Sequence, residues 1–358
     1  MITISVIMLL AAYFFMRFYP AFGGKASSGS IDRFMKSPNY KEGKFMNLED
    51  TPVMAEDASI LKTIIEFIKG PENGKPEIVE TKVFDKDEFM QGEATETKYT
   101  WFGHSTVLMK VGGKTIIADP VFSDHASPFS FTNKSFKYSN NYTVDDLPYI
   151  DIVLISHDHY DHLDMNTVKQ MDKNVGRYLV PLGVESHLTR WGIAPDKITI
   201  ADWWDEFEIE GISLAATPAR HFSGRAFSRS KTLWCSWVVR TESVSLYFGA
   251  DSGYGKHFKM IGEKYGPFDF CMIECGQYNK NWPNIHAMPE QSVQASIDLN
   301  ASQMMTIHWA KFQLALHAWA EPIERARAAA SAKGVRLSEP QIGEISTITE
   351  VSHTNTRS

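Results

Sequence analysis

One short segment constrains this chain more than any other. Residues 157–162 read His-Asp-His-Tyr-Asp-His, and the apolar run 151–156 precedes them directly. The apolar run predicts a buried strand, so the segment lies in the loop at the end of that strand. Because side chains alternate along an extended chain, His157 and His159 point to one side and can share a metal ion such as zinc.

The same segment predicts a second metal position beside the first. Asp161 and His162 turn away from the first pair, and a carboxylate suits a neighbouring ion. Two ions need more ligands, and His221, Asp251 and His308 each follow a later strand-like run, where sites of α/β proteins collect. Each of these residues alone is more often an ordinary hydrogen-bonded side chain, and the first segment alone could be a solvated turn. The strand-then-ligand pattern repeated along the chain favours the metal site.

The composition fits a sizeable enzyme. The chain has 358 residues, of which 43% are hydrophobic and 12% aromatic, enough for one large core or two small ones. A net charge of −7 argues against nucleic acid as the main partner, since a phosphate backbone favours a basic face. The three cysteines, Cys235, Cys271 and Cys275, predict core packing and no disulfide framework, which fits a reducing compartment.

The N-terminal residues predict a membrane anchor over 1–22. Residues 2–16 are apolar and uncharged, and after Arg17 the run 18–22 is apolar again. A spanning helix needs about 20 residues, so the aromatic end of this segment would sit in the membrane interface. A cleaved signal peptide is the alternative. By the positive-inside rule, the basic residues that follow predict a catalytic domain on the cytoplasmic side of a membrane-associated protein.

The remaining chain divides into an arm and one large domain. Residues 23–95 predict a linker, flexible at the glycine- and serine-rich stretch 23–30, and an arm with one helix over 59–69. Residues 96–350 alternate strand and helix patterns, which predicts helices covering two packed sheets. The strands are expected near 151–155, 178–181, 212–217, 233–240, 243–249, 268–274 and 303–307, and the helices near 165–173, 184–191, 289–299 and 321–333.

The order His-x-His-x-Asp-His, then His, Asp and His, resembles the metallo-β-lactamase superfamily. The resemblance is closest to the branch of N-acylphosphatidylethanolamine-hydrolysing phospholipases D and their bacterial relatives, and it spans roughly residues 98–320. It implies an α/β fold, a four-layer αββα sandwich that follows the N-terminal hydrophobic segment. The supporting motifs lie at 101–107, 118–123, 154–164, 180–183, 233–237, 249–254, 265–269 and 307–309.

The resemblance also implies a ligand set for two Zn²⁺ ions per chain. It assigns one set of three residues to each ion and makes Asp251 the bridge between them. A hydroxide between the two ions would then attack the substrate, with Asp161 and Asp251 in the catalytic centre. No Gly-x-Ser-x-Gly nucleophile motif competes with this reading. The first set is His157, His159 and His221, and the second is Asp161, His162 and His308.

Four further residues near the motifs carry separate expectations. Asp119 ends a strand and is expected to orient a metal-bound imidazole, with a turn-forming role before Pro120 as the alternative. His286 matches a histidine that relatives place beside the metals, where it would steer the phosphate or protonate the leaving group; a structural role at the start of a helix is the alternative. His104 is expected to be structural, and Asp158 to point outward. The remaining histidines, at 125, 187, 257, 317 and 353, are expected to be ordinary surface or packing residues.

These expectations define a dinuclear zinc hydrolase. Its sharpest form is a phosphodiesterase that cleaves N-acyl phosphatidylethanolamine-type phospholipids, as a phospholipase D does. The alternatives are a lactonase or other ester hydrolase of the same fold, and a non-catalytic, membrane-anchored metal-binding protein. The expected partners are a phospholipid or another ester or phosphodiester, and a membrane through the N-terminal segment.

Overall fold

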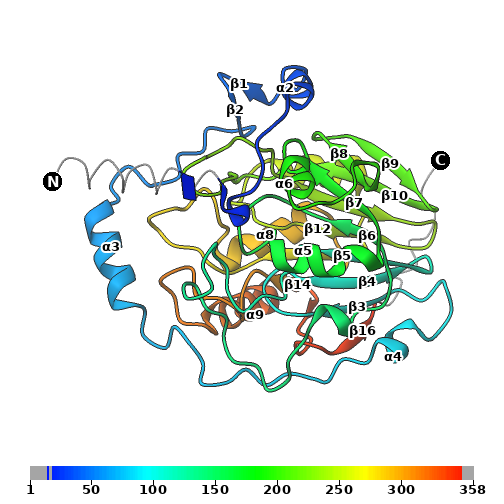
Figure 1. Ribbon diagram of the computed structural model, residues 1–358. Coiled ribbons are helices and arrows are strands. Elements are labelled where there is room, and N and C mark those ends of the chain that lie inside the picture. The colour runs from blue at the N-terminus through cyan, green and yellow to red at the C-terminus, as the bar shows by residue number, and fades with distance from the viewer. Residues whose placement is uncertain (1–13, 16–17, 349–358) are drawn as a thin grey trace.

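The computed structural model describes residues 14–15 and 18–348, and in this part of the chain two seven-stranded sheets form the centre of the molecule (Figure 1). The first sheet has the order β16-β3-β4-β5-β6-β7-β8 and the second β15-β14-β13-β12-β11-β10-β9. The strands of the first sheet are β3 (Lys98–Trp101), β4 (Val107–Val111), β5 (Lys114–Ala118), β6 (Ile150–Leu154), β7 (Val175–Pro181), β8 (Ile198–Ala201) and β16 (Ile345–Thr347). Those of the second are β9 (Glu206–Ile209), β10 (Ile212–Thr217), β11 (Ser236–Arg240), β12 (Ser245–Phe248), β13 (Phe270–Glu274), β14 (Met304–Ile307) and β15 (Leu337–Ser338).

The two sheets are built on the same plan. In the first, β16 to β5 pair antiparallel and β5 to β8 pair parallel. In the second, β9 to β12 pair antiparallel and β12 to β15 pair parallel. The carboxyl ends of parallel neighbours meet at one edge, so the loops that follow β6, β12 and β14 are positioned to build a common site.

The core lies between the sheets and continues on both outer faces. Met109 and Leu154 of the first sheet belong to one buried cluster with Trp237 and Phe248 of the second. Helices cover the outer faces: α5 (Met165–Met171) and α6 (Glu185–Arg190) pack on the first sheet, and α7 (His257–Tyr265), α8 (Pro289–Asp298) and α9 (Glu321–Lys333) pack on the second. The predicted α/β sandwich of helix, sheet, sheet and helix is therefore confirmed.

The expected strands and helices of the domain are present, and the helix α7 and the strands β8, β9, β15 and β16 are additions. In α7 the apolar residues Phe258, Ile261 and Tyr265 have helical spacing, but glycine and charged residues interrupt the pattern. The glycine is needed for packing, because a Cβ at Gly262 would lie 2.2 Å from the backbone oxygen of Asp298 in α8. The close approach of two helices is a tertiary requirement that sequence periodicity does not report.

The arm before the domain wraps around the sandwich (Figure 1). It contains the short 3₁₀ turn η1 (Pro20–Phe22), the helices α2 (Ser28–Phe34), α3 (Ile60–Lys69) and α4 (Lys86–Met90), and the hairpin of β1 (Tyr40–Lys41) and β2 (Lys44–Phe45). Phe34 and Phe45 are buried in the inter-sheet cluster, so this arm is part of the folded unit. The predicted helix over 59–69 is confirmed as α3, whose first turn is capped by the Ser59 hydroxyl and which ends at Gly70.

The prediction of a membrane-associated protein with an anchor over 1–22 is wrong. No helix in the described part of the chain has both the length and the apolar character that crossing a membrane requires. Much of the predicted segment, residues 1–13 and 16–17, lies outside the described residues. The aromatic end that was expected at a membrane interface packs on the protein instead: Phe15 and Tyr19 stack on Phe129, and the Tyr19 hydroxyl donates to the Pro128 carbonyl at 3.0 Å. The predicted cytoplasmic orientation was derived from this anchor, so it is wrong as well.

Candidate metal centre

The loop after β6 delivers the first group of polar side chains. His157 Nε2 lies 2.8 Å from His159 Nδ1, which lies 3.3 Å from His221 Nε2 in the loop after β10. The Asp251 carboxylate, in the loop after β12, places Oδ2 3.8 Å from His157 Nε2 and 3.6 Å from His221 Nε2. These four ligand atoms all lie within 4.8 Å of one another, which is compact enough for one ion.

A second group adjoins the first. Asp161 Oδ2 lies 3.5 Å from His162 Nε2, and both belong to a cluster with His308, in the loop after β14, and His104. Asp251 reaches this group with its other oxygen, since Oδ1 lies 3.1 Å from His162 Nε2 and 2.9 Å from His308 Nδ1. All seven side chains predicted as ligands thus meet at one place, and one carboxylate faces both groups.

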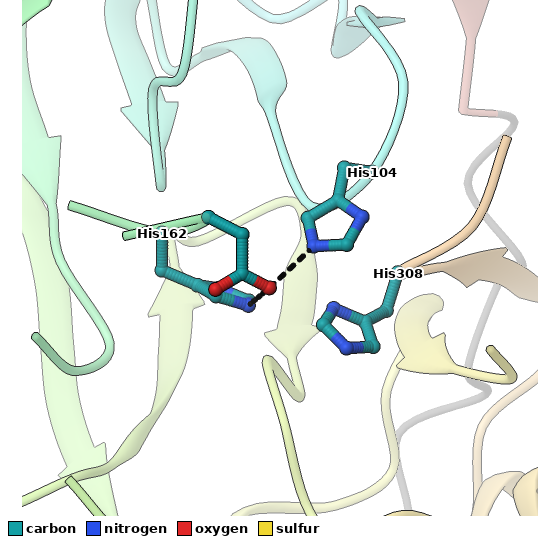
Figure 2. Close-up of side chains that lie close together, drawn as sticks. His104, His162 and His308 are labelled. Atoms are coloured by element: carbon teal, nitrogen blue, oxygen red, sulfur yellow. Dashed lines mark hydrogen bonds and ion pairs between the residues drawn. The ribbon is translucent and has the colours of Figure 1, made fainter. Parts of the chain in front are cut away.

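His104 was expected to be structural, but it stands inside the second group. Figure 2 shows His104, His162 and His308 converging from separate segments. His104 lies in the turn between β3 and β4 with a φ of 53°, and its Nε2 is 2.8 Å from Asp161 Oδ2. It can orient Asp161 or serve as a ligand itself. The Trp-Phe-Gly-His motif at 101–104 was the signal for it, since the same motif carried the resemblance.

The donor set fits divalent metal ions. His162 Nε2 and Asp251 Oδ1 are fully buried, and although they lie 3.1 Å apart, neither forms a hydrogen bond of good geometry within the described residues. Buried polar atoms without such a partner are rare in folded proteins, and ligation is one of the few roles that accounts for them. Nitrogen and carboxylate oxygen in this combination suit zinc and similar ions.

The electrostatics of the groups favour the same chemistry. Burial, and after it the neighbouring imidazoles, hold the pKa of His157 well below its ordinary value. Burial also lowers the pKa of His308, to about 3. For Asp251, burial alone would raise the pKa, but the charges of His162 and His308 hold it well below its usual range. The neutral imidazoles of His157 and His308 beside an ionised carboxylate are the protonation states that metal binding requires. His162 differs: burial lowers its pKa, but the charges of Asp251 and Asp161 raise it well above its ordinary value on balance, so a metal ion there would displace a proton.

Asp119 lies directly behind His162. Its Oδ2 is 2.7 Å from His162 Nδ1 and accepts a hydrogen bond from the Ser156 hydroxyl at 2.6 Å. Its Oδ1 accepts one from the Ser156 amide at 2.8 Å. Burial raises the pKa of Asp119, against the lowering effect of His162. The carboxylate fixes the ring so that Nε2 faces Asp251, and this is the geometry that the predicted orienting role requires.

His286 stands beside the two groups. It is held by the carboxylate of Glu274, a residue that the sequence analysis did not single out. The His286 ring lies with its centroid 5.0 Å from that of His221 and 5.1 Å from that of His308. Its Nδ1 is 2.7 Å from Glu274 Oε2 at the end of β13. Burial raises the pKa of Glu274 to about 7, and although burial lowers the pKa of His286, the charge of Glu274 raises it on balance. Glu274 ends an apolar strand just as Asp119 does, and that shared pattern was the available signal.

The expectation that Asp158 points outward is wrong. Its side chain is buried, accepts from the Gly224 amide at 2.6 Å and lies 3.2 Å from His187 Nε2. Burial alone would raise the pKa of Asp158, but the hydrogen bond and charge of His187 lower it to about 2. His187 is thus more than an ordinary packing residue, since it anchors the residue between two candidate ligands. His353 lies outside the described residues.

Arg225 closes the loop that carries the candidate ligands. The buried guanidinium donates from Nη1 to the carbonyl of Asp158 at 2.8 Å and to that of Leu163 at 2.9 Å, one near each end of the loop. From Nη2 it donates to Ala21 at 2.9 Å, and it lies 4.0 Å above the Tyr160 ring. One side chain therefore sets the span of the loop and ties it to the arm.

A cavity of about 360 Å³ opens onto both groups. His159, Asp161 and Asp251 line its polar side, and His286 and His308 stand on the same wall. Most of the other lining residues are apolar and include parts of the arm, which the sequence did not place here. Its apolar residues are Val53, Met54, Phe67, Trp282, Ile285 and Leu314.

The buried histidine and aspartate groups at the strand ends of a four-layer sandwich are typical of metal-dependent enzymes, and comparison with known proteins identifies the family. Residues 114–309, more than half of the chain, match the family model of the beta-lactamase superfamily domain. An uncharacterized protein of Mycobacterium tuberculosis is 38% identical over 314 residues, which cover 86% of this chain and 84% of that protein. The chain belongs to the metallo-β-lactamase superfamily.

Characterised relatives are more distant. The N-acyl-phosphatidylethanolamine-hydrolyzing phospholipase D 1 of Caenorhabditis elegans is 34% identical over 229 residues, which cover 60% of this chain and 64% of that protein. The mitochondrial enzyme of the same name from Saccharomyces cerevisiae is 30% identical over 246 residues, which cover 66% of this chain and 52% of that protein. The resemblance to this branch is therefore confirmed, and the prediction of a metal-dependent hydrolase is confirmed at the level of the family.

Solved structures show the same fold. Igni18, a metallo hydrolase from the archaeon Ignicoccus hospitalis, has a TM-score of 0.56 at 22% identity and covers 72% of this chain and 100% of that chain. CmlA, a diiron β-hydroxylase from Streptomyces venezuelae, has a TM-score of 0.53 at 20% identity and covers 72% of this chain and 54% of that chain. At these identities the likeness concerns the fold alone.

Replacing Arg225 should loosen the ligand loop. We expect Arg225→Met to weaken zinc binding on the order of 10- to 100-fold, the usual effect of removing a group that supports the ligands. Arg225→Lys, which keeps the charge but has fewer donors, should fall between Met and the native residue. Zinc affinity is measured by competition with a chelator, and the exposed residue Arg327 provides the matched control Arg327→Met. Native zinc affinity in a folded Arg225→Met protein would contradict this role.

Proposed function

We propose that the chain is a dinuclear zinc hydrolase that cleaves the phosphodiester bond of N-acyl phosphatidylethanolamine-type phospholipids. The observation that carries the proposal is the position of Asp251, whose two oxygens face the two groups of candidate ligands. His157, His159 and His221 would hold one ion, Asp161, His162 and His308 the other, and Asp251 would bridge them. When bound, such a pair of ions lowers the pKa of a shared water towards neutrality and offsets charge on a phosphoryl group.

The chain's own residues have distinct tasks in this reaction. Asp119 holds His162 by its Nδ1, and His104 holds Asp161, so the second group stays aligned. Glu274 accepts the hydrogen bond from His286 Nδ1, which leaves Nε2 as the nitrogen available to the cavity. A departing alkoxide needs a proton, and His286 is the candidate that supplies it.

The substrate class rests on the cavity and on the relatives. The apolar lining residues would accept the hydrocarbon part of a lipid, and the candidate ligands in the same lining would receive its phosphate. Two relatives, from Caenorhabditis elegans and Saccharomyces cerevisiae, are named as enzymes that hydrolyse N-acyl phosphatidylethanolamine. A lactone or another ester would occupy the same cavity, so the bond that breaks is the decisive observable.

Metal content tests the dinuclear arrangement. We expect two zinc ions per active chain by elemental analysis. Asp251→Ala should lose metal and activity more severely than any single histidine substitution, because two cations would repel each other without the carboxylate between them. Asp196→Ala, at an exposed site, is the control. An active protein with one ion or none would exclude this arrangement.

The position of the label from ¹⁸O-water tests which bond breaks. Attack of water on phosphorus places ¹⁸O in the phosphate of the lipid product and releases N-acylethanolamine. Mass spectrometry of both products from the zinc-loaded protein measures this. Label in a released fatty acid would mean attack on a carbonyl, and would assign the protein to the amidases or lactonases. No turnover of any ester by fully loaded protein would support the non-catalytic alternative.

His286→Ala should separate proton transfer from metal binding. Turnover of the lipid should fall ~10²–10⁴-fold, the usual effect of losing a general acid. Zinc content should stay at the native level, and bis-p-nitrophenyl phosphate should be much less affected because p-nitrophenolate leaves without a proton. Glu274→Gln should show a weaker form of the same pattern, and His125→Ala, outside the site, should show none. Equal losses on both substrates would rule out the acid role.

A further inference from the structure

A second cavity, of about 520 Å³, lies between the arm and α6. Asp158 of the ligand loop forms part of its wall, whereas His159 and Asp161 of the same loop line the cavity at the candidate metal centre. No residue lines both cavities. The size is typical of sites for small molecules, which usually combine an apolar lining with a few polar groups.

One wall of the second cavity is apolar. Phe22 and Ile31 of the arm line it together with Phe34, whose ring packs against Tyr40 at 5.4 Å between centroids. Phe227 stands at the rim and is 86% exposed. Its exposed ring adds apolar surface to the lining of the cavity.

The polar side of the cavity carries positive charge. Lys25, Lys231 and the buried Arg225 line it, and none of the three forms an ion pair with a carboxylate in the described part of the chain. Lys231 donates only to the Gly43 carbonyl, at 2.8 Å. Asp158 is the one acidic residue in the lining, and it already accepts from Gly224 and contacts His187. A lining in which these cations outnumber the single acidic residue favours an anionic ligand over a cationic one.

The walls are held in place before any ligand arrives. The Gly24 amide donates to His187 Nδ1 at 2.9 Å, and the other ring nitrogen faces Asp158. The fit between arm and helix is close, since a Cβ at Gly23 would lie 2.1 Å from His187 Nδ1 and one at Gly24 would lie 1.8 Å from the Ser186 carbonyl oxygen. A preformed cavity loses little free energy in ordering itself around a ligand.

We propose that this cavity is a binding site for a single-chain amphiphile with an anionic head group. The hydrocarbon chain lies against Phe22, Ile31 and Phe34, and the head group lies at Lys25 and Lys231. The site is separate from the candidate metal centre and needs no metal. Asp158 places this site next to the loop that carries the candidate ligands.

Calorimetric titration of the zinc-loaded full chain tests the site. The probes are dodecanoate, dodecyl phosphate and dodecyltrimethylammonium, each below its critical micelle concentration. We expect one equivalent of at least one anion to bind, with the cation at least tenfold weaker; the two anions show which head group is preferred. Equal affinity for anion and cation, or no binding of either anion, would overturn the proposal.

Paired variants locate the binding. Lys25→Glu/Lys231→Glu should weaken the anion about tenfold, whereas Lys36→Glu/Lys169→Glu, which changes the net charge equally at exposed positions outside the lining, should not. Ile31→Trp should block the cavity, and Met35→Trp, on an exposed neighbouring residue, should leave it open. Bis-p-nitrophenyl phosphate turnover and zinc content report the metal centre separately. Native anion binding in both cavity variants would place the amphiphile elsewhere and overturn the assignment.

Discussion

The arrangement of the site depends on the contacts of one carboxylate. Asp251 lies in the interior, with one oxygen 2.9 Å from His308 Nδ1 and the other 3.6 Å from His221 Nε2. A buried anion costs several kcal/mol unless positive charge or hydrogen bonds compensate for it. Burial lowers the pKa of His157 and His308, whereas Asp251 and Asp161 raise that of His162, so either a protonated His162 or bound cations can compensate for the charge of Asp251. Folding and metal binding are therefore expected to be linked in this protein.

The repeated sheet plan explains why the site can be assembled at all. Each sheet joins an antiparallel half to a parallel half, and the loops that end β6, β12 and β14 follow parallel strands. Residues separated by up to about 150 positions along the chain thus meet without a long irregular connection through the core. The inter-sheet cluster fixes the distance between the two halves, because it contains large side chains from both. A change in that packing would alter both groups of candidate ligands together.

The sequence predicts those parts of the site that are local. The His-x-His-x-Asp-His segment needs only alternation and a preceding strand, and strand ends account for His221, Asp251 and His308. Contacts set by tertiary structure were missed: His104 meets Asp161 across 57 positions, and Arg225 reaches Asp158 across 67. The anchor prediction failed for a related reason, because hydropathy counts apolar residues but does not show what they contact. Phe15 and Tyr19 contact Phe129, a loop residue more than 100 positions away.

The ligand loop is a wall shared by two cavities, and this gives Arg225 a particular importance. Its guanidinium donates to backbone carbonyls near both ends of the loop and to a carbonyl of the arm. It therefore ties the two ends of the loop to the arm. A buried guanidinium is costly, and the hydrogen bonds to carbonyls together with the nearby charge of Asp158 offset part of that cost. Such a residue is kept where alignment matters more than stability. In the proposed site of the second cavity, an anionic head group at Lys25 and Lys231 would lie close to this loop, on which the candidate metal centre is built.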